Sequence, residues 1–360
     1  MSAVLPEVAT PALVVDARIL EENIRSMAER AGRHGVRLRP HAKTHKSLEI
    51  ARRQRDAGAT GLTVATVSEA EVFAGAGFTD LFIAYPLWAD PAKGRRLRSL
   101  AERGDLSVGI DSAEGARALA AQLGAASEAV RVLVEVDSGH HRTGVAPRAA
   151  GVLADRARHA GLRVEGVFTF PGHSYAPGER EKVARQEAAA LAEAAEALTS
   201  HGVAPAVLSG GSTPTAQLVE SSAMTEMRPG VYVFGDAQQL ELGTVAPTSV
   251  ALTALATVVS HSCGQVVLDA GSKVLGADRA PWATGFGRLL DHPDARITGL
   301  SEHHAVVAWG EDGPLPDIGS RLRVVPNHCC TAVNLADELV VCADGAAADR
   351  WPVTARGANT

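Results

Sequence analysis

The stretch Leu38-Arg39-Pro40-His41-Ala42-Lys43-Thr44-His45-Lys46 joins an apolar run to a cluster of basic side chains. The apolar run, residues 36–38, predicts a short strand that stops at Pro40. Two lysines and two histidines then follow within six residues. A lysine directly after a strand is where an α/β barrel holds a reactive amine, because the catalytic groups of barrels lie at the C-terminal ends of the strands. A solvated basic turn is the alternative that the lysines alone do not exclude.

Strand-like and helix-like segments alternate along the chain from residue 36 onward. Eight such units over roughly 200 residues predict a (β/α)8 barrel of the TIM type. An open, doubly wound sheet is the alternative, although no Gly-x-Gly-x-x-Gly sequence follows the first strand, which disfavours a dinucleotide-binding fold. The predicted strands, each followed by a helical or turn segment, are residues 36–39, 61–66, 80–85, 106–111, 130–137, 163–170, 206–209 and 226–230.

The pattern changes near Thr244, after which helical periodicity is almost absent. We therefore predict a barrel domain over residues 1–243 and a C-terminal all-β domain over residues 244–360. The short β-like runs of this second domain, separated by Gly, Pro and Asp, are residues 250–260, 264–269, 305–309, 320–325 and 339–342.

The composition is that of an ordinary globular protein and excludes several functions. The 360 residues carry a net charge of −6, and no basic block is large enough to indicate nucleic-acid binding. No apolar stretch approaches the ~18 residues of a membrane span, and the N-terminus lacks the basic and apolar regions of a signal peptide. Four cysteines in a chain of this length do not indicate a disulfide scaffold, which predicts a reducing, cytoplasmic location.

The run from Pro40 to Lys46 resembles the Pro-His-x-Lys-Thr-His-Lys run of the D-threonine aldolase and D-serine dehydratase family. Those proteins are enzymes of the alanine-racemase-like fold that use pyridoxal 5'-phosphate (PLP), which a lysine holds as a Schiff base. The resemblance implies that Lys43, not Lys46, is the catalytic lysine that carries PLP, and that His41 contacts the cofactor. It also implies a homodimer, and an association of residues 1–16 with the β domain.

Two segments after the last two predicted barrel strands could bind a phosphate. Ser209-Gly210-Gly211-Ser212-Thr213-Pro214-Thr215 is rich in glycine and hydroxyl groups, so backbone N–H groups and hydroxyls can approach an anion. Barrels commonly bind phosphate after strands seven and eight, and Arg228-Pro229-Gly230-Val231-Tyr232 follows the eighth. An ordinary strand-to-helix turn is the alternative. Both segments resemble phosphate-binding segments of the family, which assigns PLP binding to Gly211, Ser212, Thr213, Gly230 and Tyr232.

The sequence Asn327-His328-Cys329-Cys330-Thr331 places an imidazole and a thiol two positions apart. Such a pair can share one divalent ion, and two protein ligands leave positions open for substrate and water, as in a catalytic metal site. A buried strand with small apolar cysteines is the alternative. The run resembles the family's metal-binding His-x-Cys or His-x-Asp, which implies His328 and Cys330 as ligands, with Cys329 turned away by strand alternation. A thiolate favours zinc over manganese or magnesium.

Two further loops after predicted strands carry polar side chains. The loop Asp137-Ser138-Gly139-His140-His141-Arg142-Thr143-Gly144-Val145 resembles the family's Asp-x-Gly-x-x-Arg-x-Gly-Val. Its Arg142 is expected beside the cofactor ring or opposite the substrate carboxylate, with a solvated loop arginine as the alternative. The loop Phe170-Pro171-Gly172-His173-Ser174-Tyr175 resembles a Gly-x-Ser/Thr-Tyr region of D-serine dehydratases, which implies that Tyr175 contacts cofactor or substrate. Phe170 departs from the more polar residues expected there.

These features predict a PLP- and metal-dependent lyase whose small-molecule substrate is a D-configured 3-hydroxy amino acid. We favour dehydration of D-serine or D-threonine to a keto acid and ammonia over retro-aldol cleavage to glycine and acetaldehyde, as in D-threonine aldolase. An amino-acid racemase is a third hypothesis, but that family's second base is a tyrosine of the C-terminal domain, and no tyrosine follows Tyr232. A non-catalytic PLP-binding protein is a fourth, although single-domain carriers of this fold lack a β domain.

Overall fold

The structure is a computed structural model that describes residues 5, 7–218, 224–310 and 314–360. The chain folds into two compact units. We call one the barrel unit; it comprises Met27–Lys43, Ala51–Gly230 and Gly357–Thr360. We call the other the β unit; it comprises Met1–Ser26, Thr44–Ile50 and Val231–Arg356.

The barrel unit contains a parallel sheet of eight strands in the order β2-β9-β8-β7-β6-β5-β4-β3. A parallel bridge between His41 and Thr63 joins the segment after β2 to β3. The predicted (β/α)8 barrel of the TIM type is confirmed, and each predicted strand overlaps an observed one. The strands are β2 (Arg37–Leu38), β3 (Leu62–Val64), β4 (Asp80–Pro86), β5 (Asp105–Ile110), β6 (Val130–Glu135), β7 (Arg163–Phe168), β8 (Val207–Gly210) and β9 (Glu226–Met227).

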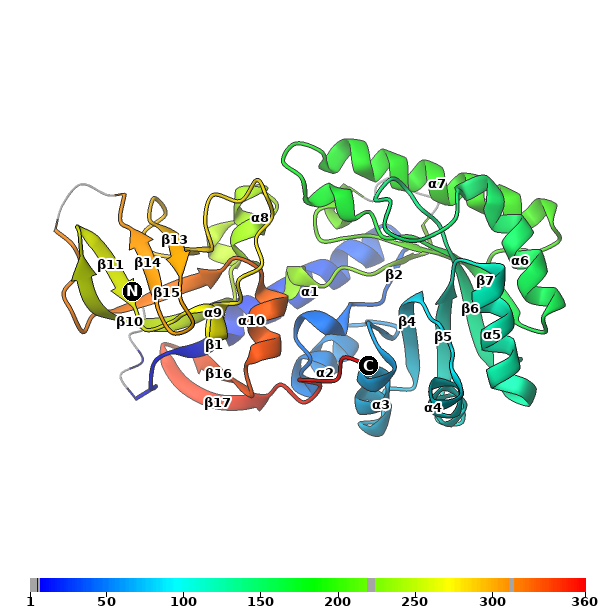
Figure 1. Cartoon of the computed structure of the whole chain (residues 1–360), viewed down its shortest axis with the longest axis horizontal. Helices are drawn as coiled ribbons and strands as arrows, with labels where there is room; N and C mark the ends of the chain where they lie inside the picture. The colour runs from blue at the N-terminus through cyan, green and yellow to red at the C-terminus, as the bar shows by residue number, and fades with distance from the viewer. Residues whose placement is uncertain (1–4, 6, 219–223, 311–313) are drawn as a thin grey trace. The chain divides into compact units, whose positions relative to one another are not determined.

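Helices alternate with these strands, and Figure 1 shows α3 to α7 flanking the parallel sheet. Four of the helices named below begin after a side chain that accepts a backbone N–H of the first turn, namely Asp16, Thr66, Asp90 and Ser112. None of the described helices is long and apolar enough to cross a membrane. The helices are α1 (Ala17–Arg33), α2 (Leu48–Asp56), α3 (Val67–Gly75), α4 (Pro91–Ala101), α5 (Ala113–Leu123), α6 (Ala150–His159) and α7 (Arg180–Ser200).

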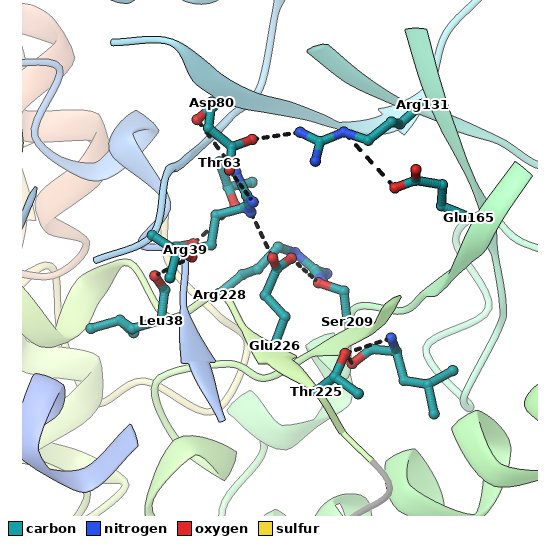
Figure 2. Close-up of polar contacts among 12 residues, drawn as sticks. Leu38, Arg39, Thr63, Asp80, Arg131, Glu165, Ser209, Thr225, Glu226 and Arg228 are labelled. Carbon is teal, nitrogen blue, oxygen red and sulfur yellow. Dashed lines mark hydrogen bonds and ion pairs between the residues drawn. The ribbon is translucent and has the colours of Figure 1, made fainter. Parts of the chain in front are cut away.

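Buried ion pairs link the strands of the barrel unit, as Figure 2 shows. Arg39, which follows β2, donates through Nε to Glu226 (2.7 Å) and through Nη2 to Asp80 (2.8 Å). Arg131 of β6 also donates to Asp80 (2.6 Å). Burial alone would lower the pKa of Arg39, but Glu226 and Asp80 raise it, so the guanidinium stays charged. Because a buried charge must be paired, these contacts tie β4 and β9 to the residue that leads into the lysine loop.

The β unit contains a nine-stranded sheet in the order β11-β14-β13-β12-β15-β10-β1-β16-β17. Strand β1 pairs antiparallel with β10 and parallel with β16, so the start of the chain completes this sheet. The predicted C-terminal all-β architecture is confirmed. The strands are β1 (Ala12–Asp16), β10 (Leu252–Ser262), β11 (Gln265–Leu268), β12 (Gly287–Leu289), β13 (Arg296–Leu300), β14 (Ala305–Ala308), β15 (Arg321–Pro326), β16 (Glu338–Ala343) and β17 (Ala346–Pro352).

The β unit also contains short helices that the sequence analysis did not predict: α8 (Ala237–Glu241), α9 (Ser272–Leu275) and α10 (Cys329–Leu335). The last corrects an expectation, because a strand was predicted through His328 and Cys330. The expected strand alternation of Cys329 and Cys330 is wrong, since both belong to the first turn of α10. A helix of seven residues shows little periodicity, and His328 at its N-cap makes no side-chain capping bond, so the sequence carries no start signal.

Candidate active site

Lys43 lies in a single 3-10 turn, η1 (Ala42–Thr44), directly after β2. The segment before it is fixed on two sides: the His41 N–H donates to Pro229 O (3.0 Å), and the Thr63 N–H donates to Pro40 O (2.9 Å). The Lys43 side chain is half-buried. Lys46, the other candidate, is 5% exposed and belongs to the β unit. Lys43 is therefore the more accessible amine and the one that stands at the end of a barrel strand.

Several of the predicted site residues contact the ring of Phe170. Lys43 Nζ lies 5.7 Å from the ring centroid and the Arg142 guanidinium lies 5.1 Å from it. The Tyr175 ring is 6.4 Å away, and the His140 ring meets Phe170 edge-on at 5.7 Å. A cation within ~6 Å of an aromatic ring, over its face, is favoured by the ring quadrupole. The structure thus brings Lys43, Arg142 and Tyr175 together, and gives a role to the aromatic residue that departed from the family pattern.

The loop that carries Arg142 is held by carboxylates at its base. Asp137 accepts N–H bonds from Gly139 (2.8 Å) and His141 (3.0 Å). Burial alone would raise the pKa of Asp137, but these bonds and the His141 side chain lower it, so the carboxylate stays ionised. The Thr143 hydroxyl donates to Glu135 (2.9 Å) on the other side of Arg142. Arg142 itself is exposed on this supported loop.

The glycine-rich turn after β8 places several hydroxyl groups in a buried position. Gly211 has φ +85°, and a Cβ there would lie 3.2 Å from Met227 Cβ, so a larger residue would be strained. The Ser212 N–H donates to Thr215 Oγ1 (3.0 Å), and the Ser212 hydroxyl is 2.9 Å from that of Ser174. Ser212 and Thr213 are each 2% exposed. The turn thus has the form of a small polar cradle.

The second predicted phosphate segment is residues 228–232. Its part up to Gly230 belongs to the barrel unit and follows the strand next to β8. Strands β8 and β9 pair at Gly210 and Met227, and the Arg228 N–H donates to Gly210 O (2.8 Å). The loops after both strands therefore start side by side. Tyr232, in the 3-10 turn η6 (Val231–Val233), is 6% exposed and belongs to the β unit.

Arg228 is a site candidate that the sequence analysis did not select. Its guanidinium donates to Ser209 Oγ and to Thr169 O (2.6 Å), and it lies 5.5 Å from the Phe168 ring centroid. Burial lowers its pKa to about 10, which still leaves it charged at neutral pH. The signal was present in the sequence, because Arg228 directly follows the eighth barrel strand.

The predicted metal ligands lie together in the β unit. His328 Nδ1 is hydrogen-bonded to the Asp278 carboxylate, and Cys330 Sγ lies 3.4 Å from Thr44 Oγ1, within hydrogen-bond reach. Burial alone would lower the pKa of His328, but the Cys330 thiolate and the Asp278 bond raise it to about 11. Cys329 donates a hydrogen bond to Cys330 and, with His328, holds the pKa of Cys330 well below its ordinary value. The two groups therefore form an imidazolium–thiolate pair.

This donor set suits a soft or borderline divalent ion. Imidazole and thiolate are common zinc ligands, and metal binding would displace the proton that the pair shares. In the described ranges no group of three or more His, Cys, Asp and Glu side chains is arranged to hold a metal. A metal here would have two protein ligands and open positions. Asp278 was missed by the sequence analysis, because it lies 50 residues before His328 and no motif connects them.

Comparisons with known proteins cover both units. The alanine racemase N-terminal domain family matches residues 15–238, and a putative serine dehydratase domain matches residues 251–342. D-threo-3-hydroxyaspartate dehydratase of Delftia sp. (strain HT23) is 38% identical over 93% of this chain and 95% of its own length. D-threonine aldolase of Arthrobacter sp is 37% identical over 98% of this chain and 94% of its own length.

A solved structure adds information on metal binding in a relative. It is described as a D-threo-3-hydroxyaspartate dehydratase mutant, with a cysteine replaced by alanine, in the metal-free form. It superposes with a TM-score of 0.88 at 35% identity, over 96% of this chain and 97% of that one. The barrel and the β domain together define an alanine-racemase-like protein. The chain belongs to the D-threonine aldolase and D-serine dehydratase family of PLP-dependent lyases, which confirms the resemblance inferred from the sequence.

Proposed function

We propose that this protein is a PLP- and divalent-metal-dependent lyase that dehydrates a D-configured 3-hydroxy amino acid. The observation that carries the proposal is the environment of Lys43: a half-buried amine at the end of β2, within 5.7 Å of the Phe170 ring centroid that Arg142 also approaches. The polar cradle at Ser212 and Thr213, in the loop after β8, fits the phosphate of PLP. Bound PLP supplies an electron sink for a reaction at the substrate Cα.

Each of the candidate site residues would then have a separate role in the reaction. Lys43 would hold the cofactor covalently and, when its amine is released, take the Cα proton. Arg142 would face the substrate carboxylate or the cofactor ring. His328 and Cys330 would hold a divalent ion, which supplies Lewis-acid chemistry when bound. Asp278 would keep the His328 ring in one orientation, as carboxylates do for metal-binding histidines.

Two sequence features support dehydration over aldol cleavage. Cys330 supplies a thiolate where aldolases of the family tend to have a carboxylate, and zinc held by sulfur suits the departure of hydroxide. The segment η4 (Gly172–Tyr175) resembles the dehydratases. We keep D-threonine aldolase activity as a second candidate, because Asp269-Ala270-Gly271-Ser272-Lys273 resembles the aldolase side and an aldolase is 37% identical to this chain.

Product analysis with D-threonine distinguishes the two reactions. We expect 2-oxobutanoate and ammonia as the main products. Glycine and acetaldehyde as the main products would contradict dehydration and support aldol cleavage. D-serine and D-threo-3-hydroxyaspartate, assayed in parallel for their keto acids, identify the preferred side chain. Equal consumption of L-threonine would contradict D-selectivity. Zinc as the native metal, the homodimer and the cytoplasmic location stay predictions.

A further inference from the structure

Helix α7 buries one carboxylate among apolar residues. The buried residues of the helix are Val183, Glu187, Ala190, Leu191, Ala194 and Leu198, and only Glu187 is charged or polar. Its side chain is almost completely inaccessible, with the residue 2% exposed. A buried carboxyl group without partners is costly, so the contacts of Glu187 indicate why it is there.

Glu187 contacts the glycine-rich turn that we assign to phosphate. Its Oε1 accepts the Gly211 N–H at 2.6 Å. A Cβ at Gly210 would lie 2.5 Å from the same oxygen, so the carboxyl group closely fits the space that this glycine leaves. Glu187 is also hydrogen-bonded to the Thr215 side chain. One carboxyl group thus contacts both ends of the turn.

The contacts continue from Thr215 to the adjacent loop. Thr215 Oγ1 accepts the Ser212 N–H (3.0 Å) and lies 3.1 Å from the Ser212 hydroxyl. The Ser212 hydroxyl is in turn 2.9 Å from Ser174 Oγ, the neighbour of Tyr175. The chain of hydrogen bonds therefore begins at Glu187 and reaches two of the segments assigned to the cofactor.

We propose that Glu187 is a positioning residue for the phosphate of the cofactor: it holds the Gly210–Ser212 backbone so that the Ser212 and Thr213 groups face the anion. The proposal rests on the proposed function insofar as the anion is the phosphate of PLP. Glu187 does not itself touch the cofactor in this arrangement. It binds the Gly211 N–H and, through Thr215, fixes the position of Ser212.

The charge of Glu187 makes this role pH-dependent. Burial raises the pKa of Glu187 to about 7, although the Gly211 N–H and the Arg228 guanidinium both oppose the rise. Arg228, which follows β9, is the charged group whose field acts on it; Gly211 and Thr215, which are hydrogen-bonded to the carboxyl group, do not ionise. A phosphate dianion nearby disfavours the ionised carboxylate. Anion affinity in the wild type should therefore fall as the pH rises through about 7.

Three variants test the proposal. Glu187→Leu removes the acceptor at similar volume, Glu187→Gln keeps an oxygen acceptor without charge, and Glu193→Gln is a control on the exposed face of the same helix. Affinities of the apoprotein for PLP, for pyridoxal and for inorganic phosphate are measured by titration calorimetry. We expect Glu187→Leu to weaken PLP and phosphate by about tenfold or more, because the buried Gly211 N–H is left without its acceptor. Pyridoxal, which lacks the phosphate, should be unaffected, and so should every affinity of Glu193→Gln.

The outcomes separate this proposal from the proposed function. Equal weakening of PLP and pyridoxal, or no weakening, would overturn the role of Glu187. If Glu187→Leu does not fold, Glu187→Gln decides through the ratio of its phosphate affinity to that of the wild type between pH 6 and 8.5. The titration of phosphate itself cancels in this ratio. The ratio should rise with pH, because only the wild type gains a carboxylate charge that disfavours the anion. A flat ratio would overturn the proposal. Inorganic phosphate needs no Lys43, so its result stands even if Lys43 does not carry PLP.

Discussion

The barrel unit and the β unit build their candidate sites in different ways. In the barrel unit, the residues assigned to PLP follow strand ends, and the parallel pairing of β2, β9 and β8 places those loops side by side. In the β unit, His328 and Cys330 are fixed by side chains from distant parts of the sequence, Asp278 and Thr44. A site at the ends of parallel strands follows from strand order alone, whereas a site made by long-range side-chain contacts needs the structure.

The largest expected effect lies in the barrel unit, at Lys43. Lys43→Ala should abolish covalent attachment of PLP and lower turnover by roughly 10³-fold or more, because in the proposed mechanism the amine would both anchor the cofactor and move the Cα proton. Borohydride reduction of the wild type, followed by peptide mass mapping, should place the pyridoxyl group on Lys43. A label on Lys46, or no label with PLP bound, contradicts the assignment and the strand-end argument behind it.

The second prediction tests whether the buried ion pairs stabilise the barrel unit. Arg39→Met should lower the free energy of unfolding by about 3–5 kcal/mol, because the buried Glu226 carboxylate loses its ion pair with Arg39. The matched control is Arg25→Met, whose pair with Glu22 is exposed on both sides and should contribute less than ~1 kcal/mol. Urea unfolding measures both. Equal losses in the two variants would mean that the buried pairs do not fix the strands.

The third prediction concerns the β unit and separates two adjacent cysteines. His328→Ala should lower turnover by roughly 10²-fold, the scale of Lewis-acid assistance, and chelation of the wild type should do the same while the PLP label on Lys43 remains. Cys329→Ala should keep its metal and most of its turnover, because Cys329, although buried and hydrogen-bonded to Cys330, is not one of the two predicted ligands. Metal content by elemental analysis accompanies each rate. Full turnover of the chelated enzyme would remove the metal from the mechanism.

Prediction from the sequence succeeded where the physical cause was local or periodic. The eight barrel strands could be predicted because each is a short apolar run followed by a helical or turn segment. The α10 helix, the Glu187 contact with Gly211 and the Arg39–Glu226 pair could not be predicted. The two contacts span 24 and 187 residues, and no local pattern encodes them.

Asp278 gives the smallest expected effect and the sharpest test of the comparison, because nothing in the sequence indicates it. Burial alone would raise its pKa, but the hydrogen bond and charge of His328 lower it, so the carboxylate is ionised where it meets the imidazole. An ionised partner fixes the ring orientation and increases its basicity as a ligand. Asp278→Asn keeps the shape and removes the charge, so metal affinity should fall by about 10–100-fold, while PLP affinity stays unchanged. Competition with a chromogenic chelator measures the first and titration calorimetry the second; the exposed Asp317→Asn is the control. Unchanged metal affinity in Asp278→Asn would mean that the ligand pair is positioned by α10 alone, and that long-range contacts are not what distinguishes the β unit.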